Sequence, residues 1–261
     1  MRKELLVILV MMNNDREIEW LLREKYNGQK SREFYNDVSR IEKGEPVDYV
    51  IGFSCFLGAK IDLSFKPLIP RVETEYWVEK ALADIKNTFG DKPIHVLDIF
   101  SGSGCIGIAT LMRFPNAHVD FVDIDESMAK QIQINLELNS ISKERYSIFV
   151  SNVLSKIPNN SKYDVVLANP PYVDKSRNVT DESVLKNEPH RALFADNNGM
   201  ALVNELIQSV GFFLKEHALV YIEHDDDQVP RIQDILNKAG YTHYEFYKDQ
   251  FGLSRYLRIQ V

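Results

Sequence analysis

The stretch Ile94-His95-Val96-Leu97-Asp98-Ile99-Phe100-Ser101-Gly102-Ser103-Gly104 decides the fold of this 261-residue chain. Residues 94–99 predict a strand, because they form a short, largely apolar run that ends at turn-forming residues. The glycines that follow allow a sharp turn and let the backbone approach a ligand, since no Cβ stands in the way. Residues 105–112 predict a helix that begins directly after this turn, so its first amides are free to bind a ligand.

The alternation of strand and helix continues along the rest of the chain. We expect further strands at 117–122, 146–150, 163–168 and 217–223, helices at 126–138, 198–213 and 229–238, and a closing antiparallel pair at 244–248 and 255–259. Strands separated by helices at this spacing predict a doubly wound, mainly parallel α/β sheet of seven strands. Ligands of such sheets bind at the carboxyl ends of the strands.

The N-terminal region has a helical pattern. Over residues 1–45, apolar residues recur at helical spacing, with Asp15 and Ser31 as the predicted caps of two helices. The apolar run at 5–12 is too short to span a bilayer and no small-residue cleavage site follows it, so we expect the first helix of a cytoplasmic protein. A helical unit of this size has little core of its own and is expected to lean on the main domain or on a partner.

A β-hairpin linker is predicted between this helical unit and the α/β domain. Over residues 46–70, short β-type runs at 49–53 and 60–65 flank the turn-forming Leu57-Gly58-Ala59. The α/β domain then extends over 71–261, and Thr74 is the predicted cap of its first helix.

Composition limits the classes of function. A hydrophobic content of 44% and a charged content of 26% are ordinary for a soluble globular protein, and the net charge of −7 argues against a protein whose main grip is on nucleic-acid phosphate. Cys55 and Cys105 do not form the pattern of a disulfide framework. The six histidines have no helical or hairpin ligand spacing, so the sequence predicts no structural metal.

The stretch Asn169-Pro170-Pro171-Tyr172 follows the predicted strand at 163–168 and forms a stiff loop. Two prolines fix φ twice and remove two backbone donors, and Asn169 is driven to an extended conformation because it precedes a proline. A planar NH2 group fits this corner, since it can donate to the Asn169 side-chain oxygen and to the Pro170 carbonyl while stacking on Tyr172. The alternative interpretation is a proline-rich turn without a function.

The glycine loop and two later polar residues favour a nucleotide-like cofactor. Gly102-Ser-Gly104-Cys-Ile-Gly107 formally fits a dinucleotide-binding loop, and Asp123, about twenty residues on, is placed to accept hydrogen bonds from ribose hydroxyls. Asp98 favours S-adenosylmethionine over a dinucleotide, because a carboxylate repels a pyrophosphate but suits an ammonium and a sulfonium. Asn152 is placed to bind an adenine edge. The alternative interpretations are that Asp98 is only a capping or turn residue and that Asn152 is only a loop residue.

These residues resemble a known family. Asp98 to Gly104, Asp123 and Asn169 to Tyr172, in this order, resemble class I S-adenosylmethionine-dependent methyltransferases that act on planar amino or amide nitrogens. Three further stretches are similar to the release-factor glutamine methyltransferases, the HemK/PrmC family: Glu45-Pro46-Val-x-Tyr49-x-x-Gly52, Leu68-Ile-Pro-Arg-Val-Glu-Thr-Glu75, and Glu188-Pro-His-Arg-Ala-Leu-Phe-Ala195 with the later Ile222-Glu223-His224. The resemblance covers roughly residues 44–261 and implies a Rossmann-like, doubly wound, seven-stranded methyltransferase sheet.

The resemblance also implies an activity and a set of site residues. The implied reaction moves a methyl group from S-adenosyl-L-methionine, leaving S-adenosyl-L-homocysteine, to N5 of the glutamine in the Gly-Gly-Gln motif of peptide chain release factors. The partner is then a release factor docked on residues 1–45, and we expect no direct nucleic-acid target, no membrane and a monomer. Catalysis is assigned to Asn169, Pro170 and Tyr172. The cofactor is assigned to Arg71, Thr74, Asp98, Phe100, Ser101, Gly102, Gly104, Asp123, Ile124, Asn152, Val153 and Asn169. The substrate is assigned to Asn169, Pro170, Pro171, Tyr172 and Glu188.

The sequence departs from the family pattern at several places. The N-terminal helical part is shorter than usual, Asn152 stands where aspartate is usual, and Phe100-Ser101 stands where Gly-Thr is usual. Two other hypotheses remain. An amino methyltransferase acting on DNA adenine or RNA guanine requires a basic face, whereas residues 173–195 mix acidic and basic side chains. A non-catalytic binding module is disfavoured by the intact Asn169 to Tyr172 stretch.

Overall fold

The computed structural model describes residues 15–176 and 182–261. The helix expected at 5–12 lies outside these residues, and the predicted cap Asp15 lies at their boundary. Among the helices of the described chain, none is long and apolar enough to cross a membrane.

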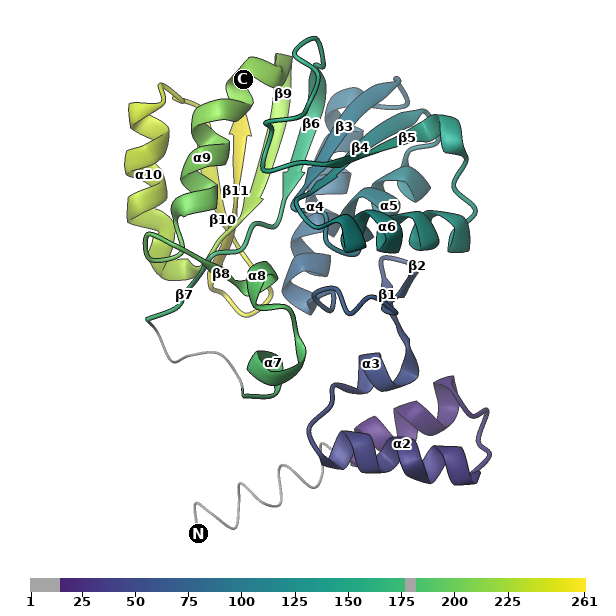
Figure 1. Cartoon of the computed structure of the whole chain (residues 1–261). Coiled ribbons are helices and arrows are strands. Elements are labelled where there is room, and N and C mark those ends of the chain that lie inside the picture. Colours follow the sequence, from purple (N-terminus) through teal and green to yellow (C-terminus); the bar gives the residue numbers. More distant parts are fainter. Residues whose placement is uncertain (1–14, 177–181) are drawn as a thin grey trace.

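A seven-stranded mixed sheet forms the centre of the molecule, as predicted (Figure 1). Its strands stand in the order β10-β11-β9-β6-β3-β4-β5, with β11 antiparallel to both of its neighbours and the other pairs parallel. The bounds are β3 Ile94–Ile99, β4 Ala117–Asp123, β5 Tyr146–Val150, β6 Tyr163–Ala168, β9 Leu214–Glu223, β10 Tyr244–Lys248 and β11 Ser254–Gln260. The expected α/β alternation is therefore confirmed, with β9 beginning earlier than the predicted 217.

Helices cover both faces of this sheet. The helices α4 (Val72–Phe89), α5 (Cys105–Arg113) and α6 (Glu126–Leu138) pack on one face, and α9 (Ala201–Val210) and α10 (Val229–Lys238) pack on the other. Neighbouring strand residues alternate between the two apolar cores, since Val165 belongs to the first cluster and Val166 to the second. The helix predicted from 198 begins at Ala201 instead, because 197–199 have positive φ and cannot be helical.

The order of the strands fixes where a ligand can bind. The chain passes from β3 to β4 and β5 in one direction, and β6 then returns to the other side of β3. Ile99 and Ala168 are register partners at the ends of β3 and β6, so the loops beginning at Phe100 and Asn169 leave the sheet side by side. This point, where the strand order reverses, is the usual ligand crevice of a doubly wound sheet.

The N-terminal part contains a helix at 15–24, α2 (Arg32–Glu42) and α3 (Val47–Ile51). Ser31 caps α2 as predicted, because its side chain accepts a hydrogen bond from the Phe34 amide. The helices share a small apolar cluster made of Leu21, Phe34, Ile41, Val47, Val50 and Ile51. The unit is joined to the remainder by the hairpin, and α7 (Glu182–Asn187) touches it at Gly44, whose carbonyl accepts from Asn187 Nδ2 at 2.9 Å.

The predicted strand at 49–53 is wrong. Pro46 precedes a helix there, and the helix ends at Gly52, whose φ is +99°. The hairpin follows as β1 (Phe53–Phe56) and β2 (Ala59–Asp62), with Leu57 and Gly58 both at positive φ, as a two-residue primed turn requires. A domain boundary at 46 stays a prediction, and α3 lies directly after it.

Short elements complete the chain. They are η1 (Lys143–Arg145), β7 (Val173–Asp174), α8 (His190–Leu193), β8 (Phe194–Ala195), η2 (Gly211–Phe213) and η3 (Asp226–Gln228). The sequence did not predict these elements, except for η2, which lies within the helix expected at 198–213. Of these, α8 and β8 lie near the carboxyl end of the sheet, where they frame the crevice described next.

Candidate active site

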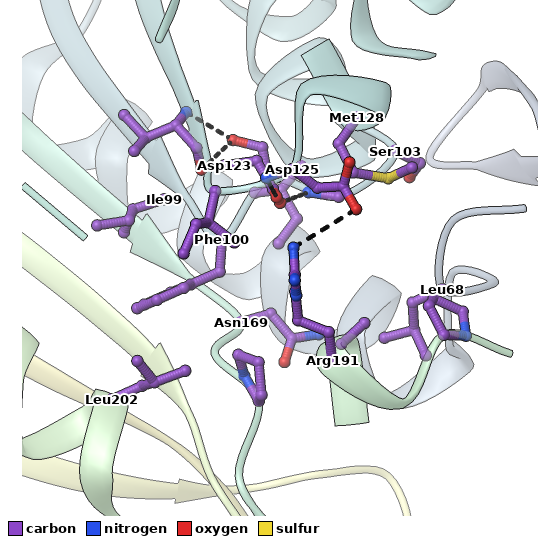
Figure 2. A pocket seen from close by; sticks show the side chains of 18 of the residues that line it. Leu68, Ile99, Phe100, Ser103, Asp123, Asp125, Met128, Asn169, Arg191 and Leu202 are labelled. Atoms are coloured by element: carbon purple, nitrogen blue, oxygen red, sulfur yellow. Dashed lines mark hydrogen bonds and ion pairs between the residues drawn. The ribbon is translucent and has the colours of Figure 1, made fainter. Parts of the chain in front are cut away.

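A cavity of about 290 Å³ lies at the carboxyl ends of β3, β4 and β6 (Figure 2). This volume is near the lower end of the range for small-molecule sites. Most of the predicted site residues line it: Arg71, Thr74, Phe100, Ser101, Gly102, Asp123, Ile124, Asn152, Val153, Asn169 and Pro171. The residues that the sequence did not assign but that also line it include Leu68, Ile99, Asp125, Met128, Arg191 and Leu202.

The glycine loop is held by hydrogen bonds from its own neighbours. Asp123 accepts the Gly102 amide on Oδ2 at 2.9 Å and the Asp125 amide on Oδ1 at 2.9 Å. Ser101 Oγ contacts the carbonyls of Asp98 and Val122, which ties the loop to β3 and β4. Burial raises the pKa of Asp123 above its ordinary value. A carboxylate accepts up to about four hydrogen bonds, so Asp123 retains capacity for two hydroxyl donors.

Phe100 adopts a backbone conformation that favours glycine. Its φ is +62°, in the left-handed region, where a non-glycine residue costs about 1–3 kcal/mol. Its ring lines the cavity and packs against the second apolar cluster. Val153 also lines the cavity at positive φ, with φ +43°. Two of the loops that surround the cavity are therefore held in strained conformations by their packing.

Asp98 lies beneath the glycine loop, not among the residues that line the cavity. Its Oδ2 accepts the Gly107 amide at 2.8 Å, and its Oδ1 has no hydrogen-bond partner among the described residues. A Cβ at Gly107 would come within 2.8 Å of Asp98 Oδ2 and 2.2 Å of the Phe121 ring, so only glycine permits this approach. Burial raises the pKa of Asp98 well above its ordinary value. Its predicted contact with an ammonium group stays a prediction.

A chain of hydrogen bonds orients the side-chain amide of Asn169. The Thr74 hydroxyl donates to Glu223 Oε2 at 2.8 Å, so the Thr74 oxygen can only accept on its other side. Asn169 Nδ2 donates to that oxygen at 3.2 Å. The amide is thereby fixed with its nitrogen toward Thr74, and Asn169 Oδ1 is left as an acceptor that receives no hydrogen bond from the described residues. Figure 2 shows Asn169 at the rim of the cavity.

Glu223, at the end of β9, accepts the first hydrogen bond of the series that runs through Thr74 to Asn169. The sequence analysis assigns Glu223 no role. It is 2% exposed and accepts three hydrogen bonds, from Thr74, from Trp77 Nε1 at 2.6 Å and from the Tyr172 hydroxyl at 2.9 Å. Burial raises its pKa even though these donors favour the ionised form. The available sequence signal is a carboxylate that directly follows the apolar run 218–222.

Thr74 is not the helix cap that the sequence predicted. The N-cap of α4 is Arg71, and Thr74 is buried in the first turn, where its hydroxyl donates to Glu223.

Tyr172 does not line the cavity, since its hydroxyl is directed to Glu223 and its carbonyl accepts from Gln228 Nε2 at 2.8 Å. A Cβ at residue 199 would lie 2.0 Å from the Tyr172 carbonyl oxygen. Only a glycine at this position therefore lets the Tyr172 backbone pack so close.

The remaining predicted residues lie around the cavity. Gly104 is the N-cap of α5 with φ +79°, and neither it nor Pro170 lines the cavity. Glu188 is buried, and its two oxygens accept from Arg71 Nη2 at 2.7 Å and from the Ile69 amide at 3.1 Å. Its contacts therefore position the segment before α4, and its direct role in substrate binding stays a prediction.

The mouth of the cavity is narrowed by a contact between its two sides. Arg191 on α8 reaches toward Asp125, the N-cap residue of α6, with 3.8 Å between Nη1 and Oδ2 (Figure 2). Both side chains are well exposed, so this pair is worth little energy and can open.

The chain is similar in sequence and in fold to known methyltransferases. The family model described as Methyltransferase small domain matches residues 81–204. The chain is 30% identical over 226 residues to the release factor glutamine methyltransferase of Francisella tularensis subsp. tularensis, covering 86% of this chain and 77% of that protein. It is 30% identical over 249 residues to the protein of the same name from Lactococcus lactis subsp. lactis, covering 94% and 88%. A solved T. thermophilus 16S rRNA methyltransferase in complex with AdoMet and guanosine has a TM-score of 0.56 at 15% identity, covering 80% of this chain and 49% of that one. At this identity the likeness shows a shared methyltransferase fold.

Proposed function

Because the chain belongs to the release factor glutamine methyltransferase family, we propose that its cavity binds S-adenosylmethionine and that the Asn169 loop holds a glutamine amide of a release factor. The chain transfers the methyl group to the side-chain nitrogen (N5) of the glutamine in the Gly-Gly-Gln motif. The observation that carries this proposal is the orientation of Asn169, whose amide oxygen is left free at the rim of the cavity by the contact with Thr74.

The residues present suit S-adenosylmethionine. Asp123 has acceptor capacity for the two ribose hydroxyls at the end of β4, and Gly102 lets the backbone pass close by without a Cβ. Asn152 and Val153 follow β5 on the side where the adenine would lie. Asp98 holds a carboxylate oxygen without a partner among the described residues beneath the loop, and an ammonium group nearby would compensate its charge.

The reaction depends mainly on alignment of the amide. S-adenosylmethionine supplies a methyl group already activated on a sulfonium, so no metal or external base is needed to activate it. Asn169 Oδ1 and the Pro170 carbonyl accept the two hydrogens of the glutamine NH2 and aim its nitrogen. Orientation of this kind supplies up to about 7–11 kcal/mol. As the nitrogen gains positive charge, both acceptors bind it more strongly, which favours the transition state over the bound substrate.

We also propose roles for the surrounding parts. Tyr172 packs beside the amide plane, with its hydroxyl restrained by Glu223. The N-terminal helical unit docks the release factor, and the hydrogen bond between Asn187 on α7 and the Gly44 carbonyl supports this role, because it links the unit to the α/β domain. Because release factors act in translation, we expect a cytoplasmic protein, and we propose that it acts as a monomer.

Incubation with radiolabelled S-adenosylmethionine tests the function. The chain is mixed with a release factor, with the same factor carrying Gln→Ala in its Gly-Gly-Gln motif, or with DNA and RNA. Label in the intact factor, and none in the Gln→Ala factor, is expected. Label found in nucleic acid alone would instead assign the chain to the amino methyltransferases of DNA adenine or RNA guanine.

A further inference from the structure

Two histidines and an aspartate meet at the opposite edge of the sheet, where the parallel strands begin. His95 is the second residue of β3, and His118 and Asp120 belong to β4. The parallel register pairs His95 with His118, and Asp120, two residues further along, lies on the same face. The fold, and not the spacing in the sequence, brings them together, which is why the histidine pattern predicted no metal site.

The three side chains have the separations of ligands around one ion. His95 Nε2 lies 3.0 Å from Asp120 Oδ2, and His118 Nε2 lies 3.2 Å from Asp120 Oδ1. All three ligand atoms lie within 4.8 Å of one another. Bonds of about 2.0–2.2 Å to a tetrahedral zinc ion separate neighbouring ligand atoms by roughly 3.3 Å. The two histidine–aspartate separations are therefore close to those of ligands around one ion, and the third pair of ligand atoms lies within 4.8 Å.

Two buried atoms of this cluster lack a well-aligned hydrogen bond. His95 Nε2 and Asp120 Oδ1 are buried and have no hydrogen-bond partner among the described residues, although each faces a charged or polar neighbour. Buried polar atoms of this kind are rare, because leaving one without a partner is costly for the folded state. A cation between them would satisfy both.

The surroundings hold the cluster in a ligand geometry. His118 Nδ1 lies 3.2 Å from the Glu144 carbonyl, so its N–H donates there and its Nε2 lone pair faces Asp120. Metal-bound histidines in proteins usually donate their other nitrogen in this way. The Tyr163 hydroxyl donates to Asp120 Oδ2 at 2.9 Å and fixes the carboxylate. Asp120 is 3% exposed, whereas the side chains of His95 and His118 are 29% and 36% exposed, which leaves a path for an ion.

We propose that His95, His118 and Asp120 bind one divalent transition-metal ion, with zinc as the expected occupant. Two imidazoles and one carboxylate are ligands that zinc accepts, and the fourth position falls to water or to Ser147 Oγ, which lies 3.1 Å from His118 Nε2. The ion would fasten the beginning of β3 to β4. Its role is structural, since the proposed methyl transfer takes place at the other end of the same strands, and the proposal does not rest on that function.

Titration calorimetry and thermal denaturation of the untagged, chelator-treated chain test the proposal. We expect one zinc ion per chain, and a rise in Tm of about 5–10 °C at zinc concentrations a hundredfold above Kd. Cobalt at the same site should give the visible absorption of a tetrahedral complex. Methyl transfer at a temperature well below Tm should be the same with and without zinc.

Two variants and a matched control distinguish this site from adventitious binding. Asp120→Asn keeps the shape of the side chain and the contact with Tyr163, and His118→Asn acts at a more exposed position, so it serves if the first variant does not fold. Both should abolish the stoichiometric heat and the rise in Tm. His217→Asn changes an exposed histidine elsewhere, at a positive φ that asparagine tolerates, and should bind like the parent chain. Absence of zinc binding by the parent, or equal binding by all three variants, would overturn the site.

Discussion

Replacing Thr74 with valine tests whether the contact between Thr74 and Glu223 orients the amide of Asn169. Valine keeps the shape of the buried side chain but removes the hydroxyl that donates to Glu223 at 2.8 Å and accepts from Asn169 at 3.2 Å. A neutral hydrogen bond is worth about 0.5–1.5 kcal/mol, so release of the Asn169 amide should lower kcat about 2- to 13-fold. The loss of a donor to the buried Glu223 should also lower Tm by several degrees.

Single-turnover transfer of labelled methyl to a release factor gives the rate, and calorimetry gives the Kd for S-adenosylmethionine. Thr74→Ser retains the hydroxyl and is the matched control, expected to react within about twofold of the parent. Because Thr74 also lines the cavity, the two measurements separate its possible roles. An unchanged rate combined with a raised Kd would mean that Thr74 contacts the cofactor and does not orient Asn169, which would refute the reasoning.

Three further predictions follow from the site. Asn169→Ala should lower kcat by about 10²–10³-fold and leave the Kd for S-adenosylmethionine nearly unchanged, because the lost acceptor serves the amide; an equal loss of cofactor affinity would contradict this role. Asp123→Ala should do the reverse and raise that Kd by about 10- to 100-fold, as calorimetry would measure. Burial raises the pKa of Asp98 above its ordinary 3.8, so the carboxyl group holds its proton more tightly in the folded chain than in the unfolded chain. The stability that the folded chain has below about pH 4 is therefore lost as pH rises toward the raised pKa. Asp98→Asn should therefore match the parent near pH 4 and have a higher Tm at pH 8 in calorimetry without cofactor; a lower Tm at pH 8 would count against a strained buried charge.

Local sequence patterns predicted most of the α/β domain. The strands and helices from residue 94 onward alternate with glycine and proline turns between them, and periodicity alone separates a six-residue strand such as 163–168 from a helix such as 126–138. The predicted strand at 49–53 is wrong because a run of four apolar residues and a glycine fits a strand or a buried helix equally well. Packing of Val47, Val50 and Ile51 against the N-terminal cluster decided in favour of a helix, and that packing is a long-range contact.

The sequence predicts which residues form the site better than it predicts the hydrogen bonds that connect them. Residues after β3, β4, β5 and β6 meet because the carboxyl ends of parallel strands share an edge, and this follows from the strand order alone. The bond between Thr74 and Glu223 joins residues 149 positions apart, on a helix and a strand that no local pattern connects. Thr74 was therefore interpreted as a cap, the commonest local use of a threonine before a helix.

Phe100 shows why a departure from a family pattern needs the structure for its explanation. The resemblance led us to expect glycine at this position, and the backbone there has the φ of +62° that glycine adopts without cost. Phenylalanine is retained in that conformation because its ring is partly buried against the second apolar cluster while it lines the cavity. Full burial of a side chain of this size is worth about 1.5–3 kcal/mol, so the partial burial of the Phe100 ring offsets part of the backbone strain.

The parallel register of the strands brings together both the active site and the histidine cluster. Register can therefore predict clusters that the spacing of residues along the sequence does not reveal. In a parallel pair, residues at equal positions in two strands are neighbours. The second residues of β3 and β4 therefore meet at the amino edge, just as Ile99 and Val122 meet at the carboxyl edge. Ligand spacing along one helix or hairpin cannot reveal such a cluster, because its members come from separate strands. Once the strand starts are predicted, chemically reactive residues at equal depth in neighbouring parallel strands can be sought at both edges of the sheet.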